Sequence, residues 1–452
     1  MHAVAFRPAP VGAHTCVTLL GTLLAAAALA AGPTGSLTPV ARPAGCIVPK
    51  YEPATISCTR VHELGFAAVL TSRDGRNLYT LGGIDERSAI AVMRRDPRTG
   101  GVRQLAGRAG CLVADWTGHG RFARCAPAHL NNPTKFVLTP DGRELVYLNG
   151  AGRYPLNAYK RSPKTGALSP VDCCGPVRGV ACPSEVATSP DGRNVYVTSV
   201  TCTGHGLSIL VRDPSSGRLT QPVGKAGCVQ RIAADGCARA PTLSFSPSGI
   251  AVTRDGAEVY VEANGGLFLF ARNRARGTLT FRACYVAVAK SPCAAFSQLW
   301  LDAPSFFDFT IAPDGRNVYV AATPGRIVVL ARSPSGQLSQ LPPPRGCVTA
   351  TGAAGRCIAA PALRGNYFEL TFSADGRTVY AGRGDGFVVL NRDRTDGSLS
   401  QLPGRYGLVR LSTSTGQNAP SPDRFFYVAT TLPQKGGPGQ DAYGLRVFRR
   451  TR

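Results

Sequence analysis

The sequence has little tryptophan, methionine or histidine, with two, two and six of these residues among 452. It also contains no G-x-S-x-G, no P-loop, no H-E-x-x-H and no dinucleotide fingerprint placed between a strand and a helix. These absences argue against serine hydrolases of the α/β type, P-loop nucleotidases, zinc proteases and Rossmann-type dehydrogenases.

Acidic residues are also few, since 27 Asp and Glu stand against 51 Lys and Arg, for a formal net charge of +24. This balance favours an anionic partner, such as an anionic cell-surface polymer. No run of five or six basic residues occurs, so we expect no specific nucleic-acid binding. The alternative is that the arginines are spread over a large surface and serve no particular partner.

Long apolar segments are missing as well, except for "VTLLGTLLAAAALAA" at residues 17–31. A small-x-small site (28–30) and the Gly32-Pro33 break follow the pattern of a cleavable secretory signal over residues 1–31. The segment is short for a membrane span. We therefore expect a secreted, extracellular protein with no transmembrane span after signal removal; an uncleaved anchor is the alternative.

What the sequence does contain is one repeated unit. The stretch "SPDGRNVYV" (189–197) has six relatives, and the seven copies are anchored at Asp74, Asp141, Asp191, Asp255, Asp314, Asp375 and Asp423. Seven copies of one motif cannot each be an active site, and Asp-Gly is typical of a tight hairpin turn. The motif is therefore interpreted as a turn.

A second motif follows most copies: an apolar run, a Pro-x-x-Gly-type turn and a polar strand, as in "LSILVRDPSSGRLTQ" (207–221). Each unit then predicts four antiparallel strands, and the apolar run predicts a strand covered on both faces. The fold class predicted is all-β: a seven-bladed β-propeller of four-stranded blades over residues 32–452, as a single domain and a monomer.

The two ends of the chain predict how this ring closes. The last unit stops at "YGLRVFRRTR", without a fourth strand, while "TGSLTPVARPAGC" (34–46) parallels "SGRLTQPVGKAGC" (216–228). We expect the N-terminal segment to supply the outer strand of the last blade, which removes an unpaired edge.

The repeat residues "SPDGRNVYV" and "RDPxTGxL" resemble the YVTN-type propeller repeat and, more distantly, the seven-bladed lactonase-like family of 6-phosphogluconolactonase-like and carboxymuconate-cyclase-like proteins. The resemblance covers nearly all of residues 32–452 and lies in scaffold residues. It implies the fold strongly and an activity weakly. That family would need a His/Arg/Glu set in the channel, and no inner strand offers such a histidine.

Fifteen cysteines are present, and Cys16 lies in the signal. An even remainder after a secretory signal predicts disulfides. The expected pairs are Cys46–Cys58, Cys111–Cys125, Cys228–Cys237, Cys284–Cys293 and Cys347–Cys357, Cys182 with Cys173 or Cys174, and a seventh between the remaining one and Cys202. The spacings are too long for zinc knuckles, so no metal is expected at the cysteines.

One repeat position departs from a scaffold. Six residues before each anchoring aspartate stand Ala68, Lys135, Glu185, Gly249, Asp308, Glu369 and Gln417. This position falls near the start of the inner strand, at the channel mouth. Glu185, Asp308 and Glu369 could hold a cation, or one could act as a general base with Lys135 polarising a carbonyl. The alternative is a hydrated channel lined by solvated charges.

Three loop residues on the same rim are further candidates. Trp116, His119 and Trp300 could stack on or bind a ligand, although each tryptophan could equally cap its own blade. We expect a binding protein for a small anionic or sugar-like ligand, or a cell-surface partner, at the disulfide-loop rim, with no cofactor beyond the cation alternative. The other two hypotheses are a lactonase or cycloisomerase at the channel mouth and a surface-associated structural protein.

Overall fold

Each copy of the Asp-Gly motif turns the chain back and joins two antiparallel strands. In the third copy, β14 (Cys182–Thr188) pairs with β15 (Asn194–Thr201), with Thr188 opposite Val195. Gly192 adopts a φ of +67°, which glycine tolerates without strain. The Ser189 hydroxyl donates to Asp191 and accepts from the Asn194 N–H, which fixes the turn. The interpretation of the motif as a turn is confirmed.

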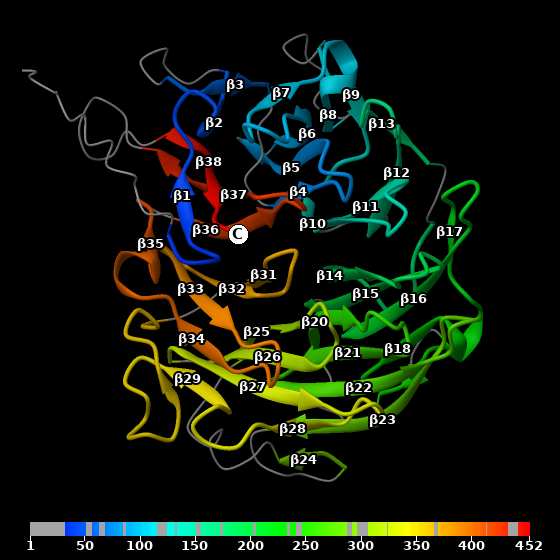
Figure 1. The fold of residues 1–452 in the computed structure, drawn as a ribbon. Helices are drawn as coiled ribbons and strands as arrows, with labels where there is room; N and C mark the ends of the chain where they lie inside the picture. The colour runs from blue at the N-terminus through cyan, green and yellow to red at the C-terminus, as the bar shows by residue number, and fades with distance from the viewer. Residues whose placement is uncertain are drawn as a thin grey trace, which may run out of the picture. The chain divides into compact units, whose positions relative to one another are not determined.

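The computed structural model describes residues 32–50, 57–62, 68–84, 87–114, 124–131, 133–150, 155–171, 175–201, 205–232, 236–240, 246–286, 292–295, 306–322, 324–365, 369–412, 414–432 and 442–452. Within Gly32–Arg452, seven mainly antiparallel sheets are arranged as the blades of a seven-bladed β-propeller (Figure 1). The first strands of successive blades contact one another around the central channel. The predicted fold class is confirmed.

Blade 1 consists of β4 (Ala68–Thr71), β5 (Asn77–Ile84), β6 (Arg87–Arg95), β7 (Val102–Gln104), β8 (Cys111–Ala114) and β9 (Ala126–Ala128). Blade 2 consists of β10 (Pro133–Leu138), β11 (Glu144–Asn149), β12 (Leu156–Arg161) and β13 (Leu168–Pro170). Blade 3 consists of β14, β15, β16 (Gly206–Arg212), β17 (Leu219–Thr220), β18 (Cys228–Gln230) and β19 (Ala238–Arg239).

Blade 4 consists of β20 (Pro247–Val252), β21 (Glu258–Ala263), β22 (Gly266–Arg272), β23 (Leu279–Val286) and β24 (Ala294–Ala295). Blade 5 consists of β25 (Phe306–Ile311), β26 (Asn317–Ala322), β27 (Arg326–Arg332), β28 (Leu338–Gln340), β29 (Cys347–Thr349) and β30 (Ile358–Ala359). Blade 6 consists of β31 (Glu369–Phe372), β32 (Thr378–Arg383), β33 (Gly386–Arg392), β34 (Leu399–Gln401) and β35 (Leu408–Arg410).

Blade 7 contains both ends of the propeller. It consists of β36 (Ser414–Pro420), β37 (Phe425–Leu432) and β38 (Ala442–Arg450) together with β1 (Leu37–Pro39), β2 (Cys46–Pro49) and β3 (Thr59–Val61). Leu37 lies opposite Arg450, and Cys46 lies opposite Arg446. The N-terminal strand therefore completes the last blade, as predicted.

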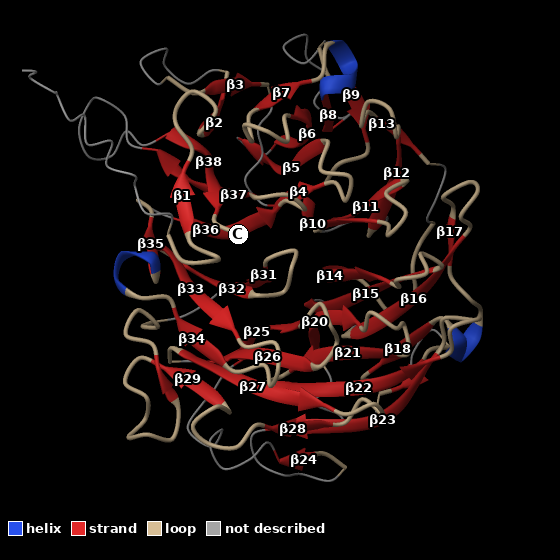
Figure 2. Cartoon of the chain, in the orientation of Figure 1, coloured by secondary structure: helices blue, strands red, loops and turns tan. Residues whose placement is uncertain are grey.

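The blades differ from the predicted four strands at their outer edge. In blade 1, β7 and β8 pair with the two ends of β6, and η1 (Gly107–Gly110) lies between them. A short parallel strand, β9, then adds to β8. Two more short helices, η4 (Gly224–Ala226) and η6 (Gly404–Tyr406), occur in the described residues, where strands dominate (Figure 2). The outer strand is thus split, and the loop that follows it is folded onto the sheet.

Disulfides fasten these outer loops. The five pairs within the described residues are Cys46–Cys58, Cys111–Cys125, Cys228–Cys237, Cys284–Cys293 and Cys347–Cys357, as predicted. Cys182 is also disulfide-bonded. Cys173, Cys174 and Cys202 lie outside the described residues, so the predicted choice of partner stays a prediction.

The two ends of the channel can now be distinguished. Cys228 lies opposite Ser208, near the start of β16, whereas the Asp-Gly turns lie at the far end of that strand. We call the end with the disulfides the disulfide rim and the end with the Asp-Gly turns the turn rim. No helix in the described part of the chain is long and apolar enough to cross a membrane.

The blades pack through apolar faces that the sequence pattern anticipated. β33, for example, buries Phe387, Val388, Val389 and Leu390 completely. Burial on both faces of such a strand follows from having a neighbouring blade on each side. Buried clusters of this kind recur between blades in the described residues. This packing holds the inner strands, and the side chains near the channel, in fixed register.

Candidate functional site

The structure joins two of the predicted channel residues directly. Lys135 on β10 and Glu185 on β14 form an ion pair between adjacent blades, with Nζ 3.0 Å from Oε1. Their side chains are 34% and 31% exposed, so solvent reaches both. The pair lies between the two rims, because Glu185 is the central residue of β14, with Cys182 at the disulfide-rim end and the Asp-Gly turn after Thr188.

Asp308 and Glu369 extend the polar set around the channel. The backbone N–H of Leu370 donates to Asp308 Oδ2 at 2.6 Å, and Asn418 Nδ2 donates to Glu369 Oε2 at 3.0 Å. Each bond runs from one blade to the carboxylate of the preceding blade. Both carboxylates are partly buried.

Burial changes the acidity of these carboxyl groups. It raises the pKa of Asp308 to about 7, with the Leu370 N–H opposing and the Glu185 charge adding to the rise. It raises the pKa of Glu369 to about 8, with Lys135 opposing and Asp308 adding. Burial likewise raises the pKa of Glu185, against the attraction of Lys135. Near neutral pH, these side chains therefore include both protonated carboxyl groups and ionised carboxylates.

Lys135 links the four residues electrostatically. Burial acts to lower its pKa, but the negative charges of Glu185, Glu369 and Asp308 outweigh it, so the pKa of Lys135 is raised. All three carboxylates are thus close enough to act on one ammonium. We call Lys135, Glu185, Asp308 and Glu369 the channel cluster.

The other three positions of the repeat carry no such chemistry. Ala68 is a buried core residue, and the side chain of Gln417 lies outside the described residues. Gly249 lies opposite Glu262 on β21, and a Cβ at Gly249 would come within 3.1 Å of the Glu262 Cβ. The glycine therefore leaves room for an acid supplied by the neighbouring strand.

Glu262 is a buried acid that the repeat count does not find. Its carboxylate accepts hydrogen bonds from the Ser248 hydroxyl and from the Gly265 N–H. Burial raises its pKa to about 7, and the Gly265 N–H opposes that rise. No local pattern in the sequence indicates Glu262, because it lies on the second strand of its blade and its place opposite Gly249 depends on the strand register.

Asn418 is the second residue that the count misses. It lies on β36 of blade 7 and reaches Glu369 of blade 6, at a point where the pairing of β36 with β37 is irregular. Simple alternation along the strand therefore does not indicate it. Within the described residues, no group of three or more His, Cys, Asp or Glu side chains lies close enough to hold a metal ion. A channel-bound cation stays a prediction.

The candidate rim residues Trp116, His119 and Trp300 lie outside the described residues. Their predicted contact with a ligand therefore also stays a prediction. His205, on the same rim, contacts Ser246, with Nδ1 2.8 Å from Oγ. This pair joins the start of β16 to the segment before β20.

Comparisons with known proteins define the fold. No family model and no curated protein matches the sequence. Among solved structures, a putative 6-phosphogluconolactonase from Bacteroides uniformis is similar, with 15% identity, a TM-score of 0.53, and 76% of this chain and 85% of that chain covered. A putative 6-phosphogluconolactonase from Bacteroides fragilis has 14% identity, a TM-score of 0.53, and 76% and 84% covered.

The periplasmic gluconolactonase of Pseudomonas aeruginosa has 17% identity and a TM-score of 0.52, with 74% of this chain and 84% of that chain covered. The protein is therefore a seven-bladed β-propeller with the fold of the lactonase-like proteins. At these identities the likeness concerns the fold, as the scaffold residues of the repeat implied.

Proposed function

We propose that this protein is a secreted propeller that binds a small, neutral, polyhydroxylated ligand, such as a sugar, at the channel cluster. The observation that carries the proposal is the convergence of one ammonium and three carboxyl groups from four blades. Lys135 and Glu185 offset each other's charge, while pKa values of about 7 and 8 leave Asp308 partly and Glu369 mostly protonated at neutral pH. The cluster then offers donors and acceptors together, as hydroxyl groups require.

The same charges disfavour an anionic ligand at the channel cluster. An added phosphate or carboxylate would approach three carboxyl groups and only one ammonium. Lys135 is already paired with Glu185, so the cluster has no net positive charge to attract an anion, and the ionised fraction of Asp308 would repel one. Of the two ligand types predicted from the sequence, the sugar-like one is supported here.

We propose that two tryptophans contact the ligand as well. Trp116 lies between β8 and β9 in the sequence and Trp300 between β24 and β25, and a flat aromatic face suits stacking on a sugar ring. Secretion is supported by the signal-like segment before Gly32 and by the disulfides, which form and persist outside the cytosol. N-terminal sequencing of the exported protein tests that part directly.

A binding experiment tests the proposal. Calorimetric titration at pH 7 would compare D-glucose and maltose with D-gluconate for the wild type and for K135M and E369Q. We expect a neutral sugar to bind and K135M to weaken binding by about tenfold or more, because a charged hydrogen-bond donor is lost. E369Q should weaken binding less, because glutamine keeps one donor and one acceptor. K160M is the matched control, since Lys160 is an exposed lysine on β12.

Two results would contradict the proposal. Gluconate that binds more tightly than every neutral sugar would exclude the charge argument. Sugar binding that K135M and E369Q leave unchanged would place the site elsewhere on the molecule.

A second candidate, hydrolysis of a sugar lactone, is favoured by the coexistence of acid and base forms in one cluster. Glu185 or Asp308, as carboxylate, would take a proton from water while the water oxygen bonds to the lactone carbonyl carbon. Lys135 would stabilise the oxyanion. The ring C–O bond would then break, and protonated Glu369 would give its proton to the leaving oxygen, yielding the hydroxy acid.

Lactone hydrolysis is tested by acid release. A pH-stat assay with D-glucono-1,5-lactone should show a rate above the spontaneous one in the wild type, with a loss of about 100-fold or more in E369Q if proton transfer to the leaving oxygen limits the reaction. A rate equal to the spontaneous one in the wild type would exclude this candidate and leave the binding proposal standing.

A further inference from the structure

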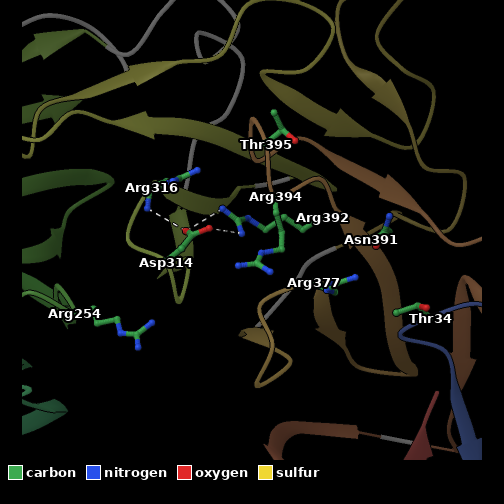
Figure 3. A pocket seen from close by; sticks show the side chains of 9 residues that line it. All are labelled: Thr34, Arg254, Asp314, Arg316, Arg377, Asn391, Arg392, Arg394 and Thr395. Carbon is green, nitrogen blue, oxygen red and sulfur yellow. Dashed lines mark hydrogen bonds and ion pairs between the residues drawn. The ribbon is translucent and has the colours of Figure 1, made fainter. Parts of the chain in front are cut away.

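The turn rim carries a pocket of a different character. It has a volume of about 910 Å³, and its lining includes five arginines, Arg254, Arg316, Arg377, Arg392 and Arg394, but only one acidic residue, Asp314, among those that the structure describes. These side chains come from turns of blades 4, 5 and 6 and from the end of β33, and they line one open space (Figure 3). We call it the arginine pocket.

Four of these five arginines have no carboxylate partner in the described residues. Asp314 is bonded by Arg392, with Nη1 2.9 Å from Oδ2 and Nη2 3.0 Å from Oδ1. Arg254, Arg316, Arg377 and Arg394 are exposed and form no salt bridge in that part of the chain. The one side-chain bond recorded among the four runs from Arg254 Nη1 to the Pro313 carbonyl, at 3.1 Å.

The repeat itself explains this excess of positive charge. In every blade, the aspartate that anchors the repeat binds an arginine from the next blade, as Asp314 binds Arg392. The arginine two residues after the aspartate, such as Arg316 or Arg377, is therefore left without an acid. Blades 5 and 6 place these two arginines beside Arg254 and Arg394, in one concave space.

We infer that the arginine pocket binds a multivalent phosphate-bearing anion, either a short soluble oligophosphate or a phosphate-containing polymer. Guanidinium groups present a planar pair of N–H donors that matches phosphate oxygens. The lining has five guanidinium groups against one carboxylate, so a ligand with several charges relieves their mutual repulsion. This site lies on the turn rim, shares no residue with the channel cluster and does not depend on the proposed function.

Among the possible anions, phosphate groups carry the most negative charge in a small volume, and this favours them as the ligand. A phosphate group carries up to two negative charges, so two or three linked groups can offset the four unpaired arginines. An acidic sugar chain carries about one carboxylate per ring and would place fewer charges in the same volume. Citrate, with three carboxylates on a small molecule, provides the comparison.

Calorimetric titration at low salt tests the inference with the full secreted chain. Tripolyphosphate should bind more tightly than orthophosphate and citrate, and binding should weaken as salt rises. The double variant R316Q/R377Q should lose about tenfold or more in affinity for tripolyphosphate, since two charged contacts are removed. Neither side chain forms a bond within the described fold, and circular dichroism checks that the variant is folded.

Arg193 supplies the matched control. It occupies the same position after Asp191 as Arg316 does after Asp314, and it is exposed but does not line the arginine pocket. R193Q should bind tripolyphosphate as the wild type does. An equal loss in R193Q and R316Q/R377Q would overturn the site, as would tighter binding of citrate or no binding of tripolyphosphate.

Chain length distinguishes the two sources of phosphate. If the ligand is a short oligophosphate, the affinity for long-chain polyphosphate should be no higher than the affinity for tripolyphosphate. R193Q should then bind both as the wild type does. A polymer that follows the rim predicts tighter binding of the long chain and a further loss in R193Q. Either result supports the arginine pocket, because both require its four unpaired arginines.

Discussion

Arg272 of blade 4 binds Asp191 of blade 3, with Nη2 3.0 and 2.9 Å from the two carboxylate oxygens. The same guanidinium donates to the side chain of Asn194 at 2.6 Å and to the hydroxyl of Tyr196 at 2.8 Å. Tyr196 in turn donates to the Gly277 carbonyl of blade 4 at 2.8 Å. Three residues of "SPDGRNVYV" thus contact one arginine of the next blade.

This contact is repeated around the ring. The seven bridges between successive blades are Arg161–Asp74, Arg212–Asp141, Arg272–Asp191, Arg332–Asp255, Arg392–Asp314, Arg450–Asp375 and Arg95–Asp423. The last of these joins blade 1 to blade 7. The Asp-Gly motif is therefore a turn and also one half of an inter-blade contact.

Removing the charge of Asp191 should destabilise the propeller. In D191N, Arg272 would stay buried without its counter-charge, although Asp191 is about one-third exposed, which reduces the cost. We expect a loss of roughly 1–3 kcal/mol in the free energy of unfolding, measured by denaturant titration. The exposed turn residue Asp213 forms no inter-blade ion pair in the described residues, so D213N should leave the midpoint almost unchanged. Equal losses in the two variants would contradict the bridge.

Closure of the ring makes a second prediction, at Gly35. This residue has a φ of +90°, its carbonyl accepts the Tyr380 hydroxyl at 3.1 Å, and an added Cβ would lie 2.2 Å from Thr378 Oγ1. G35A should therefore lower thermal stability through both backbone strain and overlap, by roughly 2–4 kcal/mol. Gly365 has a φ of +86° and open space around its Cβ position. G365A should show only the smaller effect of strain, and a comparable loss in both would argue against N-terminal closure.

Removing one disulfide should lower the stability of the propeller, and a reductant should have the same effect on the wild type. In blade 3, the Cys228–Cys237 bridge closes a small loop. C228A/C237A should lose about 2–3 kcal/mol, because the unfolded chain regains loop entropy. Thermal unfolding with and without dithiothreitol provides the measurement. Reductant should lower the wild-type midpoint further than the variant's, because the wild type has one more bridge to lose. An unchanged midpoint in the variant would show that the loop is held by β18 and β19 alone.

The sequence allowed the fold to be predicted because its signals are local. Asp191 and Gly192 sit in one turn, and the same turn chemistry recurs in each blade, so counting along the chain gave the register of Lys135, Glu185, Asp308 and Glu369. These four residues belong to different blades. Their convergence followed from equal positions in equivalent strands.

The parts that could not be predicted depend on contacts between distant residues. Arg272 and Asp191 are 81 residues apart, and no local pattern pairs them. Glu262 reaches its site from the second strand of its blade, opposite Gly249, which requires the strand register. The arginine pocket required knowing which arginines the aspartates already bind.

Glu262 gives the last prediction, which concerns pH. Its side chain is 8% exposed, and burial raises its pKa from 4.5 to about 7. Between these values the folded protein keeps a proton that the unfolded chain has released. The free energy of unfolding should therefore fall as pH rises from about 4.5 to about 7, and then level off.

E262Q keeps a neutral side chain and removes this slope, so at pH 8 it should be more stable than the wild type by up to roughly 3 kcal/mol, with little difference at pH 4.5. Asp308 and Glu369 titrate in both proteins, so the difference between the two stability curves isolates Glu262. Glu258, four residues earlier on β21, pairs with Arg332 instead. E258Q should lower stability at neutral pH, and parallel curves for E262Q and the wild type would show that Glu262 is ionised in the folded protein throughout this range.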